Sequence, residues 1–181
     1  MNNERKADGF RMEAIVAALA DAVRKCQPGD QAALRRMVPA SPPLVFYRLL
    51  LEHTAEWSDS EYERAWVAIM QGMALLALPN GEQSLGSVLG QSSAGSGQSR
   101  FWRLLEARGE TFYDLLRHII RMLAHEGGSV DWTDIAKLCL SRGETRENCR
   151  RKLARDFCHA QQKQSRNNLP GQPGKEQGVA S

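Results

Sequence analysis

Apolar residues recur along this chain mostly at the three- and four-residue spacing that places them on one face of a helix. The first such stripe predicts a helix over about residues 10–26, with Met12, Ile15, Val16, Leu19 and Val23 on its apolar face. A second stripe, Tyr62 to Leu76, follows Ser58 and Asp59, and either of these residues can cap a helix start. A third stripe, Phe112 to Leu123, follows Thr111. Three long amphipathic helices are therefore predicted.

Turn-forming residues separate further helical segments between and after these stripes. Asp30 can cap a short helix before Pro39, and Pro42-Pro43 can open a helix that runs to His53. Asp131 can cap a helix over residues 132–140, and a last helix is predicted from about Glu144 to Lys163. The chain shows no apolar–polar alternation long enough for a strand. The predicted fold class is all-α.

The run SLGSVLGQSSAGSGQSR at residues 84–100 contains a G-x-x-x-x-G spacing, as a phosphate-binding loop does. Such a loop requires Lys and then Ser or Thr after its second glycine, but this chain has Ser96 and Gly97 there. The related serine-nucleophile turn is only approximated, and neither motif is preceded by the strand it needs. We therefore interpret its SSAGSG segment, residues 92–97, as a linker, and a short helix is possible between Gly86 and this linker.

The linker divides the chain into two small helical bundles. The predicted organisation is an N-terminal helical bundle over residues 1–94, a C-terminal helical bundle over residues 95–163, and a disordered tail over residues 164–181. The tail is polar and rich in Pro and Gly, a composition that cannot bury enough apolar surface to fold.

Composition excludes several classes of protein. The 181 residues are 42% hydrophobic and 25% charged, an ordinary balance for a globular protein. No apolar run approaches the roughly 18 residues that a membrane span needs, and the N-terminal residues lack the apolar core of a signal peptide. We expect a cytoplasmic protein without a membrane partner.

The sequence offers no constellation for catalysis or for metal binding. Four cysteines, Cys26, Cys139, Cys149 and Cys158, form no C-x-x-C pair, and no carboxylates or histidines are spaced as metal ligands. No nucleophile is accompanied by a recognisable base and oxyanion donor. We therefore expect no enzyme activity, no cofactor and no small-molecule substrate.

Positive charge gathers in the C-terminal half. Residues 1–99 contain nine Lys and Arg against eleven Asp and Glu, whereas residues 100–163 contain thirteen against nine. Arg117 and Arg121, like Arg151 and Arg155, are four residues apart and so share a helix face. Rows of guanidinium groups can follow a nucleic-acid backbone, but the same arginines can also pair with neighbouring carboxylates. Both interpretations remain open at this point.

An ordered set of segments resembles a known family. The segments are LRRM (34–37), FYRLL (46–50), SLGSVLG (84–90), RFWRLLEAR (100–108), LLRHIIRML (115–123), VDW (130–132) and RRKLARDF (150–157). In this order they resemble the CasB family, the small subunits of the type I-E CRISPR surveillance complex called Cascade. The resemblance covers roughly residues 31–160.

The resemblance implies an all-helical subunit without catalytic activity. Its expected partners are other Cascade subunits, a second copy of itself, the CRISPR RNA–target DNA hybrid and the displaced non-target DNA strand. In this role it would stabilise the R-loop, whose formation is nearly balanced in energy, by contacts that do not depend on sequence. By position, the resemblance implies nucleic-acid or interface roles for Arg35, Arg36, Arg48, Arg100, Arg117 and Arg150. Spacing alone adds Arg121 and Arg151.

Two other functions fit the same residues. The chain could be a structural adaptor whose arginines contact protein partners, in which case salt affects assembly and not DNA retention. It could also be an unrelated helical regulator that binds duplex DNA, in which case it shows a sequence preference.

Overall fold

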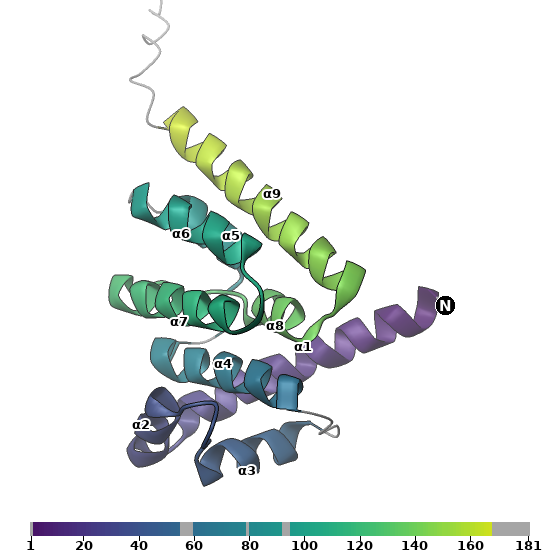
Figure 1. Ribbon diagram of the computed structural model, residues 1–181, viewed down its shortest axis with the longest axis vertical. Helices are drawn as coiled ribbons and strands as arrows, with labels where there is room; N and C mark the ends of the chain where they lie inside the picture. The colour runs from purple at the N-terminus through teal and green to yellow at the C-terminus, as the bar shows by residue number, and fades with distance from the viewer. Residues whose placement is uncertain (1, 55–59, 79, 92–94, 168–181) are drawn as a thin grey trace, which may run out of the picture.

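The computed structural model describes residues 2–54, 60–78, 80–91 and 95–167, and these residues are mostly helical (Figure 1). The helices are α1 (Asn2–Lys25), α2 (Pro28–Arg36), α3 (Leu44–His53), α4 (Ser60–Leu76), α5 (Leu85–Gln91), α6 (Gly95–Glu106), α7 (Gly109–Glu126), α8 (Trp132–Leu140) and α9 (Gly143–Asn167). Within the described residues, β structure is limited to an isolated bridge between Val38 and Ser41. The predicted all-α fold class is confirmed.

Helix α4 lies at the centre of the molecule. It packs against α1, α2, α7 and α8, and its side chains from Ala65 to Ala74 are nearly all buried. A helix that is apolar on most of its circumference must be covered on several sides. The end of the molecule opposite α2 and α3 is formed by α5, α6 and α9, with α9 running along α5 (Figure 1).

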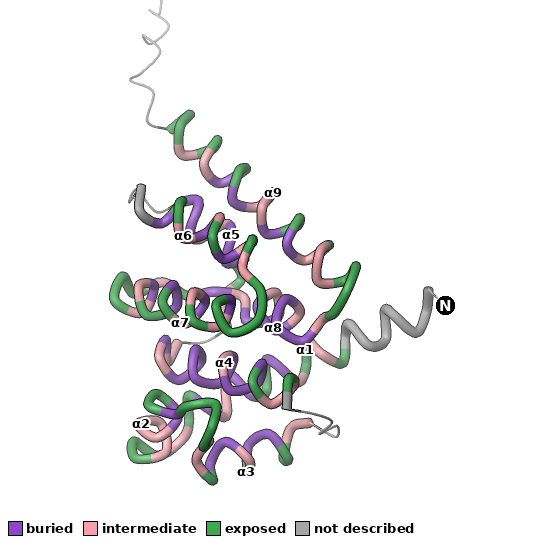
Figure 2. The backbone as a smooth tube through the Cα atoms, in the orientation of Figure 1, coloured by how far each residue is buried: buried purple, intermediate pink, exposed green. Residues whose placement is uncertain are grey.

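The buried side chains form one hydrophobic cluster that extends from Val16 on α1 to Phe157 on α9. Figure 2 shows buried segments, in purple, along α3, α4, α8 and α9. Phe101 stacks on Phe157 with 4.5 Å between ring centroids, as expected for an aromatic residue that seals a core. Phe46, Leu85, Trp132 and Phe157 are fully buried, and Tyr47 is half-buried.

Helices from both sides of the predicted boundary at residues 94 and 95 share this cluster. Helix α4 packs on α7 and α8, and α5 packs on α9. The division into two bundles stays a prediction.

Several predicted helix ends are shifted in the structure. The cap predicted at Asp30 is wrong, because α2 begins two residues earlier at Pro28 with Gln27 at the N-cap. Proline suits the first helical position, since its fixed φ matches the helix and its missing N–H is not needed there. Asp30 instead lies in the first turn and pairs with Arg48. The caps predicted at Ser58 and Asp59 lie outside the described residues.

Helices occupy part of the predicted linker and part of the predicted tail. Residues 95–97 of the predicted linker lie in the first turn of α6, and residues 92–94 lie outside the described residues. Helix α9 continues to Asn167, so four residues assigned to the tail are helical. Glutamine, which recurs near the end of α9, favours helix. The rest of the tail, residues 168–181, also lies outside the described residues.

Glycine and aspartate position α5, α8 and α9. A Cβ atom on Gly86 would collide with the carbonyl oxygen of Leu153, and one on Gly90 would lie 2.5 Å from that of Phe157, so α5 lies directly on the backbone of α9. The predicted cap of α8 is confirmed, because the Asp131 carboxylate accepts a hydrogen bond of 2.8 Å from the Thr133 backbone N–H.

None of the described helices is long and apolar enough to cross a membrane.

Candidate nucleic-acid interface

A polar stripe follows the outer side of α7. Its members are three or four residues apart and therefore share one face of the helix: Glu110, Asp114, Arg117, Arg121 and His125. We call these five residues the α7 stripe. Glu110 forms an ion pair of 2.8 Å with Arg64 of α4, and Asp114 forms one of 3.1 Å with Arg117. Among the described residues Arg121 has no acidic partner, and its side chain is exposed.

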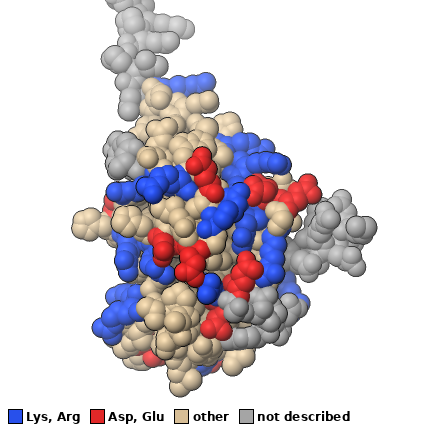
Figure 3. All heavy atoms as spheres, in the orientation of Figure 1, with Lys and Arg blue, Asp and Glu red and all other residues tan. Residues whose placement is uncertain are grey.

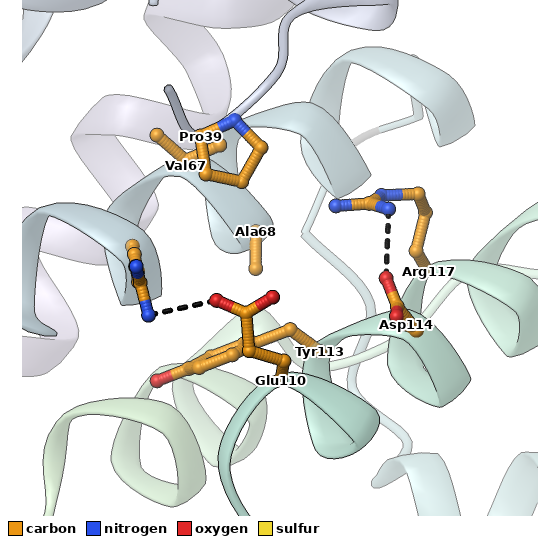
Figure 4. A pocket seen from close by; sticks show the side chains of 8 residues that line it. Pro39, Val67, Ala68, Glu110, Tyr113, Asp114 and Arg117 are labelled. Carbon is orange, nitrogen blue, oxygen red and sulfur yellow. Dashed lines mark hydrogen bonds and ion pairs between the residues drawn. The ribbon is translucent and has the colours of Figure 1, made fainter. Parts of the chain in front are cut away.

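Arg117 is held in place more firmly than its neighbours. Its Nε donates a hydrogen bond of 2.8 Å to Oε1 of Gln71, while one terminal nitrogen pairs with Asp114. Figure 4 shows Arg117 and Asp114 beside Glu110 and Tyr113. These residues line a hollow of about 30 Å³. The hollow has room for water but not for a nucleotide, so any ligand must contact the rim of this surface.

Gln71 connects Arg117 to helix α2. Its side chain is 3% exposed, and its Nε2 donates to the backbone carbonyl oxygens of Arg35, at 3.0 Å, and Met37, at 2.9 Å. These carbonyls lie at the C-terminal end of α2, where helical carbonyl groups lack partners within their own helix. Gln71 was not among the predicted site residues. The available signal was a lone polar residue within the apolar run AWVAIMQGMALL.

Arg35 makes the reciprocal contact. Its Nε donates a hydrogen bond of 2.8 Å to the carbonyl oxygen of Ala74, in the last turn of α4. Helices α2 and α4 therefore cap each other's C-terminal ends, one through an arginine and the other through Gln71. The neighbouring Arg36 is exposed and has no recorded partner among the described residues.

A second basic stripe follows the outer side of α9. We call it the α9 stripe, and it consists of Arg151, Arg155 and Arg166, all exposed. The last two were not predicted as site residues, and Arg166 falls in the segment that was assigned to the tail. Because these residues are four and eleven residues apart, they share a face that extends about 22 Å along the helix. Arg151 donates a hydrogen bond of 3.3 Å to Asn148.

Arg150 lies on the opposite side of α9 and is only 5% exposed. Its two terminal nitrogens contact the Glu147 carboxylate, at 2.5 Å, and the Ala107 carbonyl oxygen, at 2.9 Å, so it ties α9 to the end of α6. Burial lowers the pKa of this guanidinium. Glu147 also pairs with Arg108 at 3.1 Å.

Two further predicted site residues are partly engaged within the protein. Arg48 of α3 pairs with Asp30 at 2.9 Å, and this hydrogen bond raises the pKa of Arg48. Arg100 of α6 is half-buried and donates to the sulfur of Met122 on α7 at 3.3 Å.

The eight predicted arginines are thus divided among five helices. The structure brings Arg35 and Arg117 together through Gln71, and it leaves Arg36, Arg121 and Arg151 exposed on three different helices. On the face drawn in Figure 3, Lys and Arg side chains are interspersed with Asp and Glu and do not form one continuous patch. Within the described residues, no three His, Cys, Asp or Glu side chains gather into a candidate metal site.

The fold and these stripes define an all-helical protein that exposes rows of arginine on separate helices. Residues 30–157 match the family described as CRISPR-associated protein Cse2, and the chain belongs to this family. The predicted resemblance to the CasB-like small subunits is confirmed. The comparison with curated proteins gives no match.

Solved structures share the fold. A chain from a structure described as a CRISPR RNA-guided surveillance complex is similar with a TM-score of 0.66 and 21% identity, covering 88% of this chain and 98% of that one. The crystal structure of M. ruber CasB is similar with a TM-score of 0.68 and 19% identity, covering 88% of this chain and 98% of that one. A chain of E. coli Cascade bound to a PAM-containing double-stranded DNA target is similar with a TM-score of 0.60 and 21% identity, covering 81% of this chain and 95% of that one.

Proposed function

We propose that this chain is a non-catalytic subunit of a CRISPR RNA-guided surveillance complex and stabilises the R-loop through contacts that do not depend on sequence. The observation that carries the proposal is the family match over residues 30–157. It is supported by the two similar chains that come from surveillance complexes, one of them bound to a DNA target.

Most of the proposed contacts are made by arginines that form no ion pair among the described residues. Arg36, Arg121 and Arg151 are exposed and lack acidic partners among the described residues, so their guanidinium groups can reach phosphates. Arg155 and Arg166 extend the same surface along α9. The ligands are the backbone of the guide–target hybrid and the displaced DNA strand, where base pairing reads the sequence and the protein supplies charge. We leave out Arg150, because it is buried.

The test is target-DNA retention by the reconstituted complex across a salt series. Complexes would contain the wild-type chain, Arg121→Ala, Arg151→Ala or no chain. Each lost phosphate contact should flatten the slope of log affinity against log salt by about 0.7–0.9. The matched control is Arg24→Ala on α1, which removes an exposed arginine that is already paired with Asp21 at 2.7 Å, and its slope should equal that of the wild type.

The outcomes separate the candidate functions. If omission of the chain leaves both affinity and slope unchanged, the R-loop role is wrong. If the chain alone, without guide RNA, binds one duplex DNA much more tightly than a scrambled duplex of equal length, the chain is a sequence-reading regulator.

A structural adaptor is the second candidate, and a specific observation favours it. Leu44 and Leu51 of α3 are 83% and 67% exposed, and they are seven residues apart, so they share a face of the helix. Two exposed leucines on one helix face are a candidate contact with another protein. If Leu44→Ser and Leu51→Ser block incorporation into the complex while the arginine variants keep the wild-type salt slope, the adaptor function is supported alone.

A further inference from the structure

Arg117 differs from the other candidate contact residues because a buried side chain fixes its orientation. A free arginine loses rotamer freedom when it binds a phosphate, at a cost of about 0.5–1.5 kcal/mol. Arg117 has lost much of that freedom already, because its Nε is bound to Gln71 and its side chain is 24% exposed. Its second terminal nitrogen has no recorded bond among the described residues and can bind a ligand.

We propose that Gln71 is a positioning residue that holds the guanidinium of Arg117 and the arginine-bearing end of α2 in one orientation toward a phosphodiester backbone. This inference rests on the proposed function, because it assumes that the α7 stripe contacts nucleic acid.

The hydrogen-bond pattern leaves Gln71 only one arrangement. Its amide nitrogen can donate two hydrogen bonds, and both are used by the carbonyls of Arg35 and Met37. Its amide oxygen accepts from Arg117. A reversed amide would place an NH₂ group against the guanidinium and an oxygen against two carbonyls, and all three contacts would become repulsive. The Gln71 side chain therefore connects the C-terminal end of α2 directly to the guanidinium of Arg117.

The burial of Gln71 strengthens the effect of these hydrogen bonds on the orientation of Arg117. Gln71 is 3% exposed, so water cannot replace a lost partner easily, and an unpaired polar group at this site costs free energy. The adjacent carboxylate of Asp114 is 70% exposed in its pair with Arg117, so this second contact is screened by solvent and is weaker. The orientation of Arg117 thus depends more on Gln71 than on its acidic neighbour.

Gln71 also holds the C-terminal end of α2 in place. Arg35 and Arg36 are the last two residues of α2, and Gln71 binds the backbone carbonyl of the first of them. One amide therefore fixes the separation between two basic elements that are far apart in sequence. A track that follows a phosphate backbone needs such a fixed separation, because contacts made by mobile elements each lose entropy on binding.

The test is a double-mutant cycle on DNA retention by the reconstituted complex. Gln71→Met keeps the length and apolar stem but removes all three hydrogen bonds. It should weaken retention of target DNA by about threefold to tenfold, the cost of ordering one flexible side chain. In an Arg117→Ala background the same substitution should weaken retention less, because one of the two groups that it positions is gone. A purely structural role for Gln71 would weaken both backgrounds equally, and that result would overturn the inference.

A second readout needs no nucleic acid. In the full-length chain, nitrogen NMR should show the Nε–H of Arg117 as a slowly exchanging resonance that Gln71→Met abolishes, while the resonance of exposed Arg121 is unchanged. If the Arg117 resonance exchanges as fast as that of Arg121 in the wild type, the positioning role is wrong even if the surface binds DNA. If Arg117→Ala and Arg121→Ala both leave retention unchanged, the proposed surface itself is wrong, and the inference falls with it.

Discussion

Neighbouring arginines on α9 have opposite environments. Arg150 is buried and bound to Glu147 and Ala107, whereas Arg151 is exposed and contacts only Asn148 among the described residues. One residue of helix rotates a side chain by about 100°, which is enough to move it from the packed side to the solvent side.

This difference predicts unequal effects on stability. Arg150→Ala should lower the free energy of unfolding by about 1–3 kcal/mol, because it removes packed atoms and leaves a carbonyl without its donor. Arg151→Ala should change it by less than about 0.5 kcal/mol. Urea unfolding followed by circular dichroism measures both, and equal effects would contradict the described burial.

Cysteine reactivity is a second prediction at this scale. Burial raises the pKa of the Cys139 thiol to about 12, whereas Cys158 is exposed on α9. Because the thiolate is the reactive form, Cys139 should stay unmodified in the folded protein at pH 8 while Cys158 is alkylated.

Mass spectrometry after iodoacetamide treatment, with and without urea, distinguishes the sites.

The raised pKa of Cys139 also means that the unfolded chain loses the thiol proton at a lower pH than the folded protein does. The free energy of unfolding should therefore fall as the pH rises above about 9. Rapid labelling of native Cys139 would show that α8 is not packed as described.

At the scale of elements, the contact between α5 and α9 depends on two glycines. Gly86 and Gly90 are one helical turn apart and let the backbones of the two helices touch at Leu153 and Phe157. A methyl group has no space at either position, and the obstacle is backbone, which cannot move aside as a flexible side chain can.

We therefore expect Gly86→Ala and Gly90→Ala to destabilise the protein, each by about 1–3 kcal/mol, although alanine favours helix. Gly29→Ala on α2 is the matched control, because its new methyl group meets nothing within 4 Å. It should be neutral or stabilising by up to about 1 kcal/mol. Thermal unfolding compares the three variants, and destabilisation by Gly29→Ala alone would contradict this description of the contact.

At the scale of the whole molecule, the buried residues form one cluster from α1 to α9. Helix α4 contacts helices on both sides of the predicted division at residues 94 and 95. Elements that share a core lose their stability together.

We accordingly expect one cooperative unfolding transition, with tryptophan fluorescence and helical circular dichroism changing together. Trp66 on α4 and Trp132 on α8 report on the interior of this cluster. Two resolved transitions would instead support two independent bundles over residues 1–94 and 95–163.

The sequence by itself determined the helices and the family. Apolar spacing over about residues 10–26 and in the stripe Phe112 to Leu123 indicated α1 and α7, because a helix that buries one face must repeat its apolar residues every three to four positions, although α1 begins eight residues earlier, at Asn2. The cap at Asp131 was equally readable, since capping is a contact between residues two or three apart. The ordered segments from LRRM to RRKLARDF identified the family.

Only the tertiary structure decided which arginines are available. Arg150 lies three residues before Leu153 and seven before Phe157, so it continues the apolar stripe of α9, but its partner Ala107 is 43 residues away. Gln71 contacts Arg117 across 46 residues. Helix periodicity tells which side chains share a face, whereas the distant element that covers that face is set by packing. The exposure of each basic group, and therefore its role, follows from the folded chain.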